Sequence, residues 1–276
     1  MPVDGNSMKA TKEIKTPMLK YFGSKWRLAP WIIEHLPEHE LYVEPFTGSG
    51  AVLFRKPRSK KELINDIDGD LYNLYKVIQN PDTCSLLIRA LKRTPYHRRA
   101  YECAFEDRAY GPHDAVTEAK NYVVRSFMAV HPEGVHKETV GFSRSNHITK
   151  GSGHWNPREW MNYPRALASI HKRLQNVLIE QRSALHIIKE QDREDTCFYC
   201  DPPYVHGVRS AGSYRYEMTE QEHIALLECL KNARGRVVLS GYANPLYDEA
   251  LLGWQRITRR EQANGGRKTE EVLWIK

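Results

Sequence analysis

Short runs of β-branched, aromatic and aliphatic residues alternate with helical patterns over much of the chain. The runs predict strands at 41–46, 62–66, 177–181, 196–200, 236–240, 254–259 and 271–275. Helices are predicted over 70–79 and 220–233, and a third begins at Pro245. Thr219 and Glu222 form a capping box before the second of these helices. The alternation predicts an α/β fold with a seven-stranded, mostly parallel sheet and helices on both faces.

The alternation breaks between about residues 83 and 176, where the pattern becomes mainly helical. Helices are predicted there over 83–93, 114–129 and 158–175. A polar loop over 131–157, rich in Gly, His, Ser, Asn and Lys, joins the last two. A loop of this length inside a compact protein is usually functional or disordered. We therefore predict an α/β domain, residues 17–94 and 171–276, interrupted by a helical insertion, residues 95–170.

The ends and the cysteines of the chain indicate where the protein acts. The 276 residues contain no apolar run near the ~20 that cross a membrane. Residues 1–16 are polar, lack the apolar centre of a secretion signal and are predicted to be a disordered lead. The five cysteines are odd in number and irregularly spaced, which favours reduced thiols in a cytoplasmic protein. Cys197 and Cys200 form a C-x-x-C, but in a strand they face opposite sides, so we interpret them as small buried residues.

The distribution of charge along the chain indicates what kind of partner the protein binds. The formal net charge is +7, and between residues 131 and 176 seven lysines and arginines stand against three glutamates. Such a concentration of positive charge favours a polyanionic partner such as nucleic acid. Four histidines of this region could suggest a metal site: His131, His136, His147 and His154. Their spacing is irregular and no cysteine or carboxylate cluster joins them, so we expect no metal.

The stretch YVEPFTGSGA predicts a strand that ends at Glu44-Pro45, then a tight turn with Gly48 and Gly50 and then a helix, and the upstream stretch LKYFGSKWRLAPWI also leads into a helix. Glycines in such a turn let a ligand lie close to the backbone. The next strand ends at Asp66, at the spacing at which a carboxylate can hold the hydroxyls of a ribose. The third glycine of a dinucleotide site and the G-K-[ST] of a P-loop are both missing. A nucleoside without a pyrophosphate therefore fits this turn better than NAD or ATP.

The stretch CFYCDPPY runs a strand into two prolines, which cannot continue regular pairing and which hold the backbone extended. Asp201 and Tyr204 are thereby presented just past a strand end, where ligands bind in open α/β sheets. A carboxylate and a backbone carbonyl can accept hydrogen bonds from the amine of a nucleobase and stabilise the charge that develops on it. An aromatic ring can stack on a base rotated out of its helix. Alternatively, Asp201 caps a local turn.

The segments YFGSK, EPFTGSGA, NDID and DPPY occur in this order, with a helical insertion before DPPY, and VVLSGY and RKTEEVLWIK follow. In this arrangement the chain resembles the Dam-like, D12-class DNA adenine N6-methyltransferases over about residues 18 to 276. The phage and prophage members look most similar. The resemblance implies a Rossmann-like catalytic domain, S-adenosylmethionine as methyl donor and double-stranded DNA as substrate, with the target adenine flipped out. Whether the protein is a monomer or a homodimer stays open.

The resemblance also implies the site residues. Those carried over as cofactor-binding are Tyr21, Gly23, Lys25, Glu44, Pro45, Phe46, Gly48, Gly50, Asp66 and Asp201. Those that would hold the target adenine are Asp201, Pro202, Pro203 and Tyr204. The insertion is implied to read DNA, and its candidate contacts are Arg125, Lys137, Arg144 and Lys150. No metal is implied, because a sulfonium is already activated.

The insertion departs from the GATC-specific members of the family. Their Asn-x-x-x-Phe-Asn-Gly-Leu-x-Arg stretch is replaced here by VRSFMAVHPEGVHKETVGFSRS, so the recognition sequence stays open. Arg125 could pair with Glu118 instead of a phosphate. Tyr214 and Tyr216 could close over the flipped base or pack as loop residues. Three other activities also stay open: cytosine N4 methylation, RNA methylation and DNA binding without catalysis.

Overall fold

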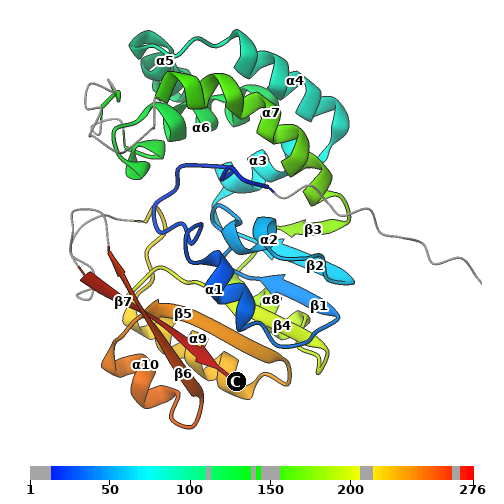
Figure 1. Cartoon of the computed structure of the whole chain (residues 1–276), viewed down its shortest axis with the longest axis vertical. Coiled ribbons are helices and arrows are strands. Elements are labelled where there is room, and N and C mark those ends of the chain that lie inside the picture. Colours follow the sequence, from blue (N-terminus) through cyan, green and yellow to red (C-terminus); the bar gives the residue numbers. More distant parts are fainter. Residues whose placement is uncertain (1–13, 110–112, 138–140, 144–155, 206–213, 263–267) are drawn as a thin grey trace, which may run out of the picture.

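A seven-stranded sheet lies at the centre of the computed structural model, which describes residues 14–109, 113–137, 141–143, 156–205, 214–262 and 268–276 (Figure 1). The strands are β1 (Leu41–Glu44), β2 (Lys61–Asn65), β3 (Val177–Glu180), β4 (Thr196–Cys200), β5 (Arg236–Tyr242), β6 (Gln255–Gln262) and β7 (Lys268–Ile275). Their order is β3-β2-β1-β4-β5-β7-β6. Strands β1 to β5 pair in parallel, whereas β7 is antiparallel to both β5 and β6. The predicted α/β class with a mostly parallel sheet is confirmed.

Helices cover both faces of this sheet. The helices of the described residues are α1 (Ala29–Glu34), α2 (Ala51–Arg55), α3 (Gly69–Gln79), α4 (Pro81–Arg93), α5 (Arg98–Ala109), α6 (Ala115–Met128), α7 (Asn156–Leu174), α8 (Ala184–Glu190), α9 (Glu220–Asn232) and α10 (Pro245–Ala250). In β1, Tyr42 packs with α1, α2 and α3, while its neighbour Val43 packs with α8, α9 and α10. Figure 1 shows α1 in front of the sheet and α8 and α9 behind it. Alternate side chains of the inner strands β1, β2, β4, β5 and β7 therefore belong to two separate cores.

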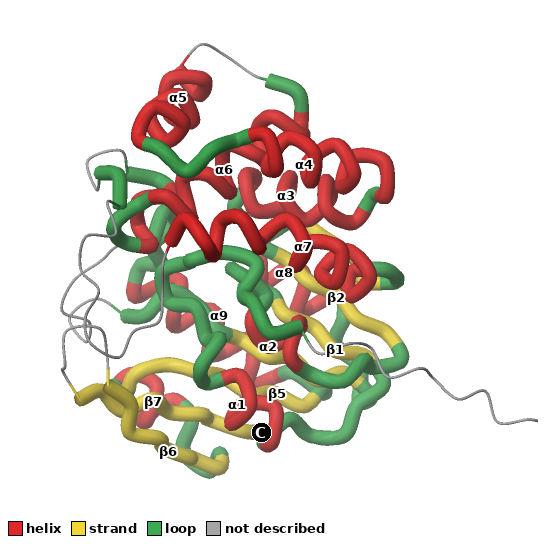
Figure 2. Tube along the Cα trace, turned by 45° about the horizontal axis from the view of Figure 1, so that its top comes forward, coloured by secondary structure: helices red, strands yellow, loops and turns green. Residues whose placement is uncertain are grey.

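Helices α4 to α7, with the short 3-10 helix η1 (Pro132–Val135), form a helical layer beside the sheet (Figure 2). They pack on one another and on α3, and their buried face includes Leu87, Tyr122 and Ile170. This layer contains the predicted insertion, whose boundaries at 95–170 stay a prediction. None of the described helices is long and apolar enough to span a bilayer.

The predicted elements differ from the observed ones in a few places, each with a local cause. Strand β1 ends at Glu44 rather than at residue 46, because Pro45 has no N–H to continue the ladder. Helices α5 and α8 were not predicted; α5 is highly polar, with weak helical periodicity. The capping box of Thr219 and Glu222 before α9 is confirmed. Ile14, which was placed in the disordered lead, is buried with 6% of its surface exposed and belongs to the folded core.

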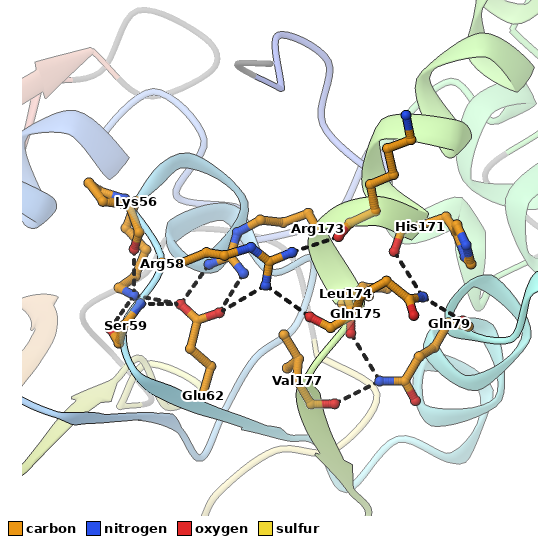
Figure 3. A network of polar contacts seen from close by, with 12 residues as sticks. Lys56, Arg58, Ser59, Glu62, Gln79, His171, Arg173, Leu174, Gln175 and Val177 are labelled. Carbon is orange, nitrogen blue, oxygen red and sulfur yellow. Dashed lines mark hydrogen bonds and ion pairs between the residues drawn. The ribbon is translucent and has the colours of Figure 1, made fainter. Parts of the chain in front are cut away.

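A buried network of charges fastens α7 to the sheet beside the start of β3 (Figure 3). Glu62 on β2 accepts two hydrogen bonds from Arg173 on α7, at 2.5 and 2.8 Å, and one from Lys56 at 2.8 Å. Arg58 donates to the carbonyl oxygens of Lys172 and Gln175, which lie at the C-terminal end of α7. Ion pairs that are largely shielded from water therefore hold the end of α7 in place, where the chain leaves the helical layer and enters β3.

Candidate active site

A pocket of about 610 Å³ opens beyond the carboxyl ends of β1, β2 and β4. Its walls come from residues 21–25, 44–49, 51–52, 65–68, 182–185 and 214–218, together with Tyr199, Asp201, Pro203, Glu222 and Leu226. Strands β1 and β4 are neighbours in the sheet, although β2, β3 and the helical layer separate them in the sequence. The chain therefore changes its winding direction between β1 and β4, and open α/β sheets bind ligands at such a switch point.

The glycine turn after β1 borders this pocket and cannot accept larger residues without a shift of its neighbours. Gly48 and Gly50 have φ values of +50° and +67°, in the left-handed region that favours glycine. A Cβ on Gly50 would lie 2.7 Å from the Tyr75 hydroxyl, and one on Gly48 would lie 3.1 Å from the Tyr21 ring. The Tyr75 hydroxyl also donates to the Gly48 carbonyl at 2.9 Å. The turn is therefore a rigid, narrow cradle, with space for a ligand on its open side.

Asp66 follows β2 and faces the same turn. Its Oδ2 accepts a hydrogen bond from the Gly48 N–H at 2.8 Å, and its Oδ1 accepts one from the Asp68 N–H at 2.9 Å. Burial raises the pKa of the Asp66 carboxyl to about 6, although these backbone donors oppose the shift. The carboxylate that was predicted to hold a ribose therefore lies at the pocket wall, next to the glycine turn.

Glu44 lies at the base of the pocket, at the end of β1. It is 2% exposed and accepts a hydrogen bond from the Tyr42 hydroxyl at 2.5 Å. Burial raises its pKa to about 7, and the Tyr42 bond and Lys56 oppose this. Pro45 and Phe46 line the pocket beside it. The pocket therefore presents acidic groups to its ligand, which suits a cation.

Lys25 from the first segment meets Asp201 from the end of β4. The Lys25 Nζ lies 2.8 Å from the Asp201 Oδ2, while the Ser240 hydroxyl donates to the Asp201 Oδ1 at 2.9 Å. Burial alone would lower the pKa of Lys25, but Asp201 and Glu271 raise it above its usual range, so Lys25 stays charged. Burial raises the pKa of Asp201, which Lys25 and Ser240 oppose. Lys25 thus orients the Asp-Pro-Pro-Tyr carboxylate and balances its charge.

Tyr204 points away from the large pocket. Its hydroxyl donates to the Glu271 Oε1 at 2.5 Å, and its ring meets Tyr242 edge-to-face at 4.5 Å. Together with Ser240, Gly241, Asn244 and other residues, Tyr204 lines a second, narrow hollow. Asp201 and Pro203 line the large pocket instead. The Asp-Pro-Pro-Tyr segment therefore borders the large pocket through Asp201 and Pro203, while the hollow beside Tyr204 has no space for a water molecule.

Residues 214–218 cover part of the large pocket. Tyr214 packs edge-to-face on Phe22 with ring centres 5.0 Å apart, and its hydroxyl occupies the space that a Cβ on Gly23 would need. Arg215 fastens the segment through ion pairs with Asp68 at 2.9 Å and Asp70 at 2.7 Å. Tyr214 was considered as a cover for a flipped base, but the structure places it beside the YFGSK segment over the large pocket.

The four residues that were predicted to contact DNA lie in different environments or outside the described residues. Arg125 is 1% exposed, and its guanidinium donates to the carbonyl oxygens of Val135 and Ala104 at 3.0 and 2.8 Å. This corrects the prediction that Arg125 contacts DNA, since it fastens η1 and α5 to α6 and has no surface to offer a phosphate. Lys137 is exposed and lies 3.3 Å from Glu133. Arg144 and Lys150 lie outside the described residues.

The sequence also led to expectations about metal ligands and cysteines, and it missed some residues that line the site. The described residues contain no group of three or more potential metal ligands. Cys197 and Cys200 are buried free thiols. Three contributors to the site were not predicted: residues 182–185 after β3, Arg215, and Glu271. Only the first had a usable signal, because the polar Arg182 and Ser183 follow a predicted strand that would end at the same edge of the sheet.

The sheet is Rossmann-like, and a pocket large enough for a nucleoside lies beside the stiff Asp-Pro-Pro-Tyr rim, which can hold an amine. This arrangement is typical of methyltransferases. The chain belongs to the D12 class N6 adenine-specific DNA methyltransferase family, whose model matches residues 21–264. Its activity is N6 methylation of adenine in DNA. This decides against cytosine N4 and RNA methylation.

Individual relatives are distant over most of the chain. The chain is 25% identical over 278 residues to a DNA adenine methylase of Salmonella typhi, which covers 92% of this chain and 93% of that protein. It is 26% identical over 255 residues to a type II methyltransferase of Lactococcus lactis subsp. cremoris, with 88% and 87% covered. It is 24% identical over 247 residues to a DNA N-6-adenine-methyltransferase of Escherichia phage P1, with 84% of this chain and 30% of that protein covered.

Proposed function

We propose that the large pocket binds S-adenosylmethionine and that the Asp-Pro-Pro-Tyr segment at its wall holds an adenine flipped out of double-stranded DNA. The observation that carries this proposal is the position of Asp201 at the wall of the large pocket, where Lys25 and Ser240 hold its carboxylate. When bound, S-adenosylmethionine supplies a methyl group on a sulfonium centre. The glycine cradle at Gly48 and Gly50, the Asp66 carboxylate and the acidic pocket base fit its ribose and its positive charge.

Asp201 would act directly on the target amine. Its two oxygens already accept from Lys25 and Ser240, and each keeps a lone pair for an amine N–H. With the Pro202 carbonyl as a second acceptor, the amine would be held facing the large pocket. As the bond from the amine nitrogen to the methyl carbon forms, the bond from that carbon to the sulfonium sulfur would break and leave S-adenosylhomocysteine as a neutral thioether. The nitrogen would become positive, the Asp201 carboxylate would stabilise that charge, and the extra proton would then leave to water. Holding the two substrates in line contributes much of the rate enhancement.

The partner surface of this proposal is the basic insertion. Exposed lysines and arginines of this region, such as Lys137, would contact phosphates, and other residues of the insertion would read bases in the major groove. Binding should therefore weaken steeply as salt rises. We propose that the enzyme acts at one short sequence in the cytoplasm of a bacterial cell, as its bacterial and phage relatives suggest.

The proposal is tested by long-read sequencing of DNA from a methylation-free host that expresses the protein. N6-methyladenine at one short motif would support site-specific methylation and would identify the recognition sequence. Marks spread over most adenines would keep the chemistry and reject sequence specificity. The absence of adenine marks, with retained DNA binding, would favour a silent DNA-binding protein.

Cofactor binding is expected to weaken below pH 6 because Asp66 must be ionised to accept ribose hydroxyls. With a pKa of about 6, affinity should fall roughly tenfold per pH unit below that value. Calorimetry with S-adenosylhomocysteine between pH 5 and 8 measures this, and Asp66→Asn should flatten the fall below pH 6. Glu44→Gln is the matched variant. The pKa of the Glu44 carboxyl is about 7, so this change should alter the affinity profile at higher pH and leave the fall below pH 6 in place. An unchanged profile in Asp66→Asn would show that Asp66 does not hold the cofactor.

A further inference from the structure

One wall of the large pocket has no secondary structure of its own. Residues 21–25 line the pocket, yet they lie before α1 and belong to no helix or strand. Main-chain N–H and C=O groups without a helix or a strand ladder must find other hydrogen-bond partners when they are buried. The position of this wall therefore depends on groups that other elements bring to it.

Ser126 on α6 supplies such a group to Lys20, the residue just before this wall. The Lys20 N–H donates to the Ser126 hydroxyl at 3.0 Å, and the same hydroxyl donates to the Lys20 carbonyl at 2.9 Å. A hydroxyl can do both, because it has one proton to donate and lone pairs that accept. Ser126 is 1% exposed, and 106 positions separate it from Lys20 in the chain. One buried side chain thus binds both main-chain polar groups of Lys20.

The same helical layer makes further contacts with this segment. The Tyr163 hydroxyl on α7 donates to the Met18 carbonyl at 2.8 Å, and this bond is buried. The Lys20 Nζ lies 3.0 Å from the Glu159 Oε2 on α7, and it lies 5.5 Å from the centre of the Phe127 ring on α6. Side chains of α6 and α7 therefore hold the chain at residues 18–20, immediately before it enters the pocket.

Tyr21 lies between this anchor and a second one. Its ring borders the glycine turn, where a Cβ on Gly48 would lie 3.1 Å away. Three residues further on, the Ser24 hydroxyl lies 2.9 Å from the Ser49 hydroxyl in the same turn. The segment therefore crosses from the helical layer to the glycine turn, and its first anchor is the pair of hydrogen bonds from Lys20 to Ser126.

We propose that Ser126 is a positioning residue of the cofactor pocket, which fixes the main chain at Lys20 and thereby keeps Tyr21 against the glycine turn. The proposal rests on the cofactor site proposed above. It gives the helical layer a second role, because the layer completes a wall of the pocket as well as offering a surface to DNA. A loosened wall would have to be ordered each time the cofactor binds, and that cost lowers the affinity.

The first readout is amide hydrogen exchange in Ser126→Ala, measured residue by residue by NMR without any ligand. The Ser24 N–H donates to the Tyr21 carbonyl at 3.2 Å and should exchange at least about fivefold faster, because its bond opens when the segment moves. The Ala29 N–H, bonded at the start of α1, is the internal reference and should stay within twofold of the wild type. Unchanged exchange at Ser24, or an equal acceleration at Ala29, would overturn the role.

The second readout is the calorimetric dissociation constant of S-adenosylhomocysteine, which should rise about five- to twentyfold in Ser126→Ala. Ser85→Ala is the matched control, since its hydroxyl donates at 2.8 Å to the Pro81 carbonyl on the exposed surface of α4, and its affinity should equal that of the wild type. Faster exchange at Ser24 with an affinity within twofold of the wild type would overturn the positioning of the cofactor. If the wild type does not bind the compound, the proposed function fails, while exchange at Ser24 still decides whether Ser126 holds the segment.

Thermal denaturation and a second variant separate a folding defect from this role. If Ser126→Ala does not fold, Tyr163→Phe keeps the buried ring and removes the hydroxyl that donates to the Met18 carbonyl. The dissociation constant should then rise at least about threefold. Tyr96→Phe is its control, because that hydroxyl donates to the Ser143 carbonyl at 3.0 Å within the helical layer. Wild-type affinity in Tyr163→Phe would overturn the holding of this wall by α6 and α7.

Discussion

Replacing Asp201 with alanine is expected to reduce the rate of methyl transfer at least about a thousandfold. The change removes the acceptor of the amine N–H groups and the charge that stabilises the transition state, each of which is costly to lose in a dry site. It also leaves the Lys25 ammonium beside the target base without its 2.8 Å partner. The measurement is single-turnover transfer of a labelled methyl group to a duplex that contains the recognition sequence.

Two variants control this experiment. Asp201→Asn keeps the shape of the side chain, so a loss similar to that of the alanine variant would assign the effect to the charge. Asp195→Asn changes a carboxylate just before the opposite end of β4, where Asp195 pairs with Arg193 at 3.1 Å, and should leave the rate unchanged. A rate within tenfold of the wild type in Asp201→Ala would remove Asp201 from the proposed mechanism.

Replacing Glu62 with glutamine is expected to lower the free energy of unfolding by about 3–5 kcal/mol. Glu62 is 5% exposed and accepts hydrogen bonds from Arg173 and Lys56, and removing one member of a buried ion network leaves the remaining charges uncompensated. The measurement is urea denaturation at pH 7. Glu40→Gln is the matched control, because its pair with Lys60 at 2.9 Å is exposed and should contribute less than about 1 kcal/mol.

The pH dependence of this effect has a defined sign. Burial alone would raise the pKa of Glu62, but Arg173 and Lys56 outweigh it and hold the pKa below its usual value. The ionised network therefore contributes its full stability above the unfolded pKa of about 4.3, and loses it as the pH falls through the lower folded value. The difference between wild type and Glu62→Gln should shrink below pH 4. A difference that stays constant from pH 7 to pH 3 would contradict this assignment.

Much of the fold could be predicted because its signals are local. Each of the seven predicted strands overlaps an observed one, since a buried parallel strand is a short run of apolar residues with strong β preference. The glycine turn was recognisable because Gly48 and Gly50 adopt positive φ, a requirement that few other residues meet. Helices α5 and α8 were missed, because their formation depends on packing more than on their own sequence pattern.

The site was harder to predict than the fold. Arg125 resembled a DNA contact, because a basic residue in a basic region is usually exposed, yet three helical elements enclose it. Glu271 offered no signal, since it lies 67 residues beyond its partner Tyr204, in a strand with no motif of its own. Arg215 likewise meets Asp68 and Asp70 from a distance of 147 and 145 positions in the chain.

The sequence by itself determined the strand and helix pattern, the rigid turn after β1 and the stiff Asp-Pro-Pro-Tyr rim, because each follows from the conformational limits of neighbouring residues. Only the tertiary structure decided which charges meet. The pairing of Lys25 with Asp201 and Glu271, and the burial of Arg125, depend on which elements pack together and how much water they exclude. The energy of interaction between two charges depends on how much water is excluded around them, and no local stretch of sequence specifies that.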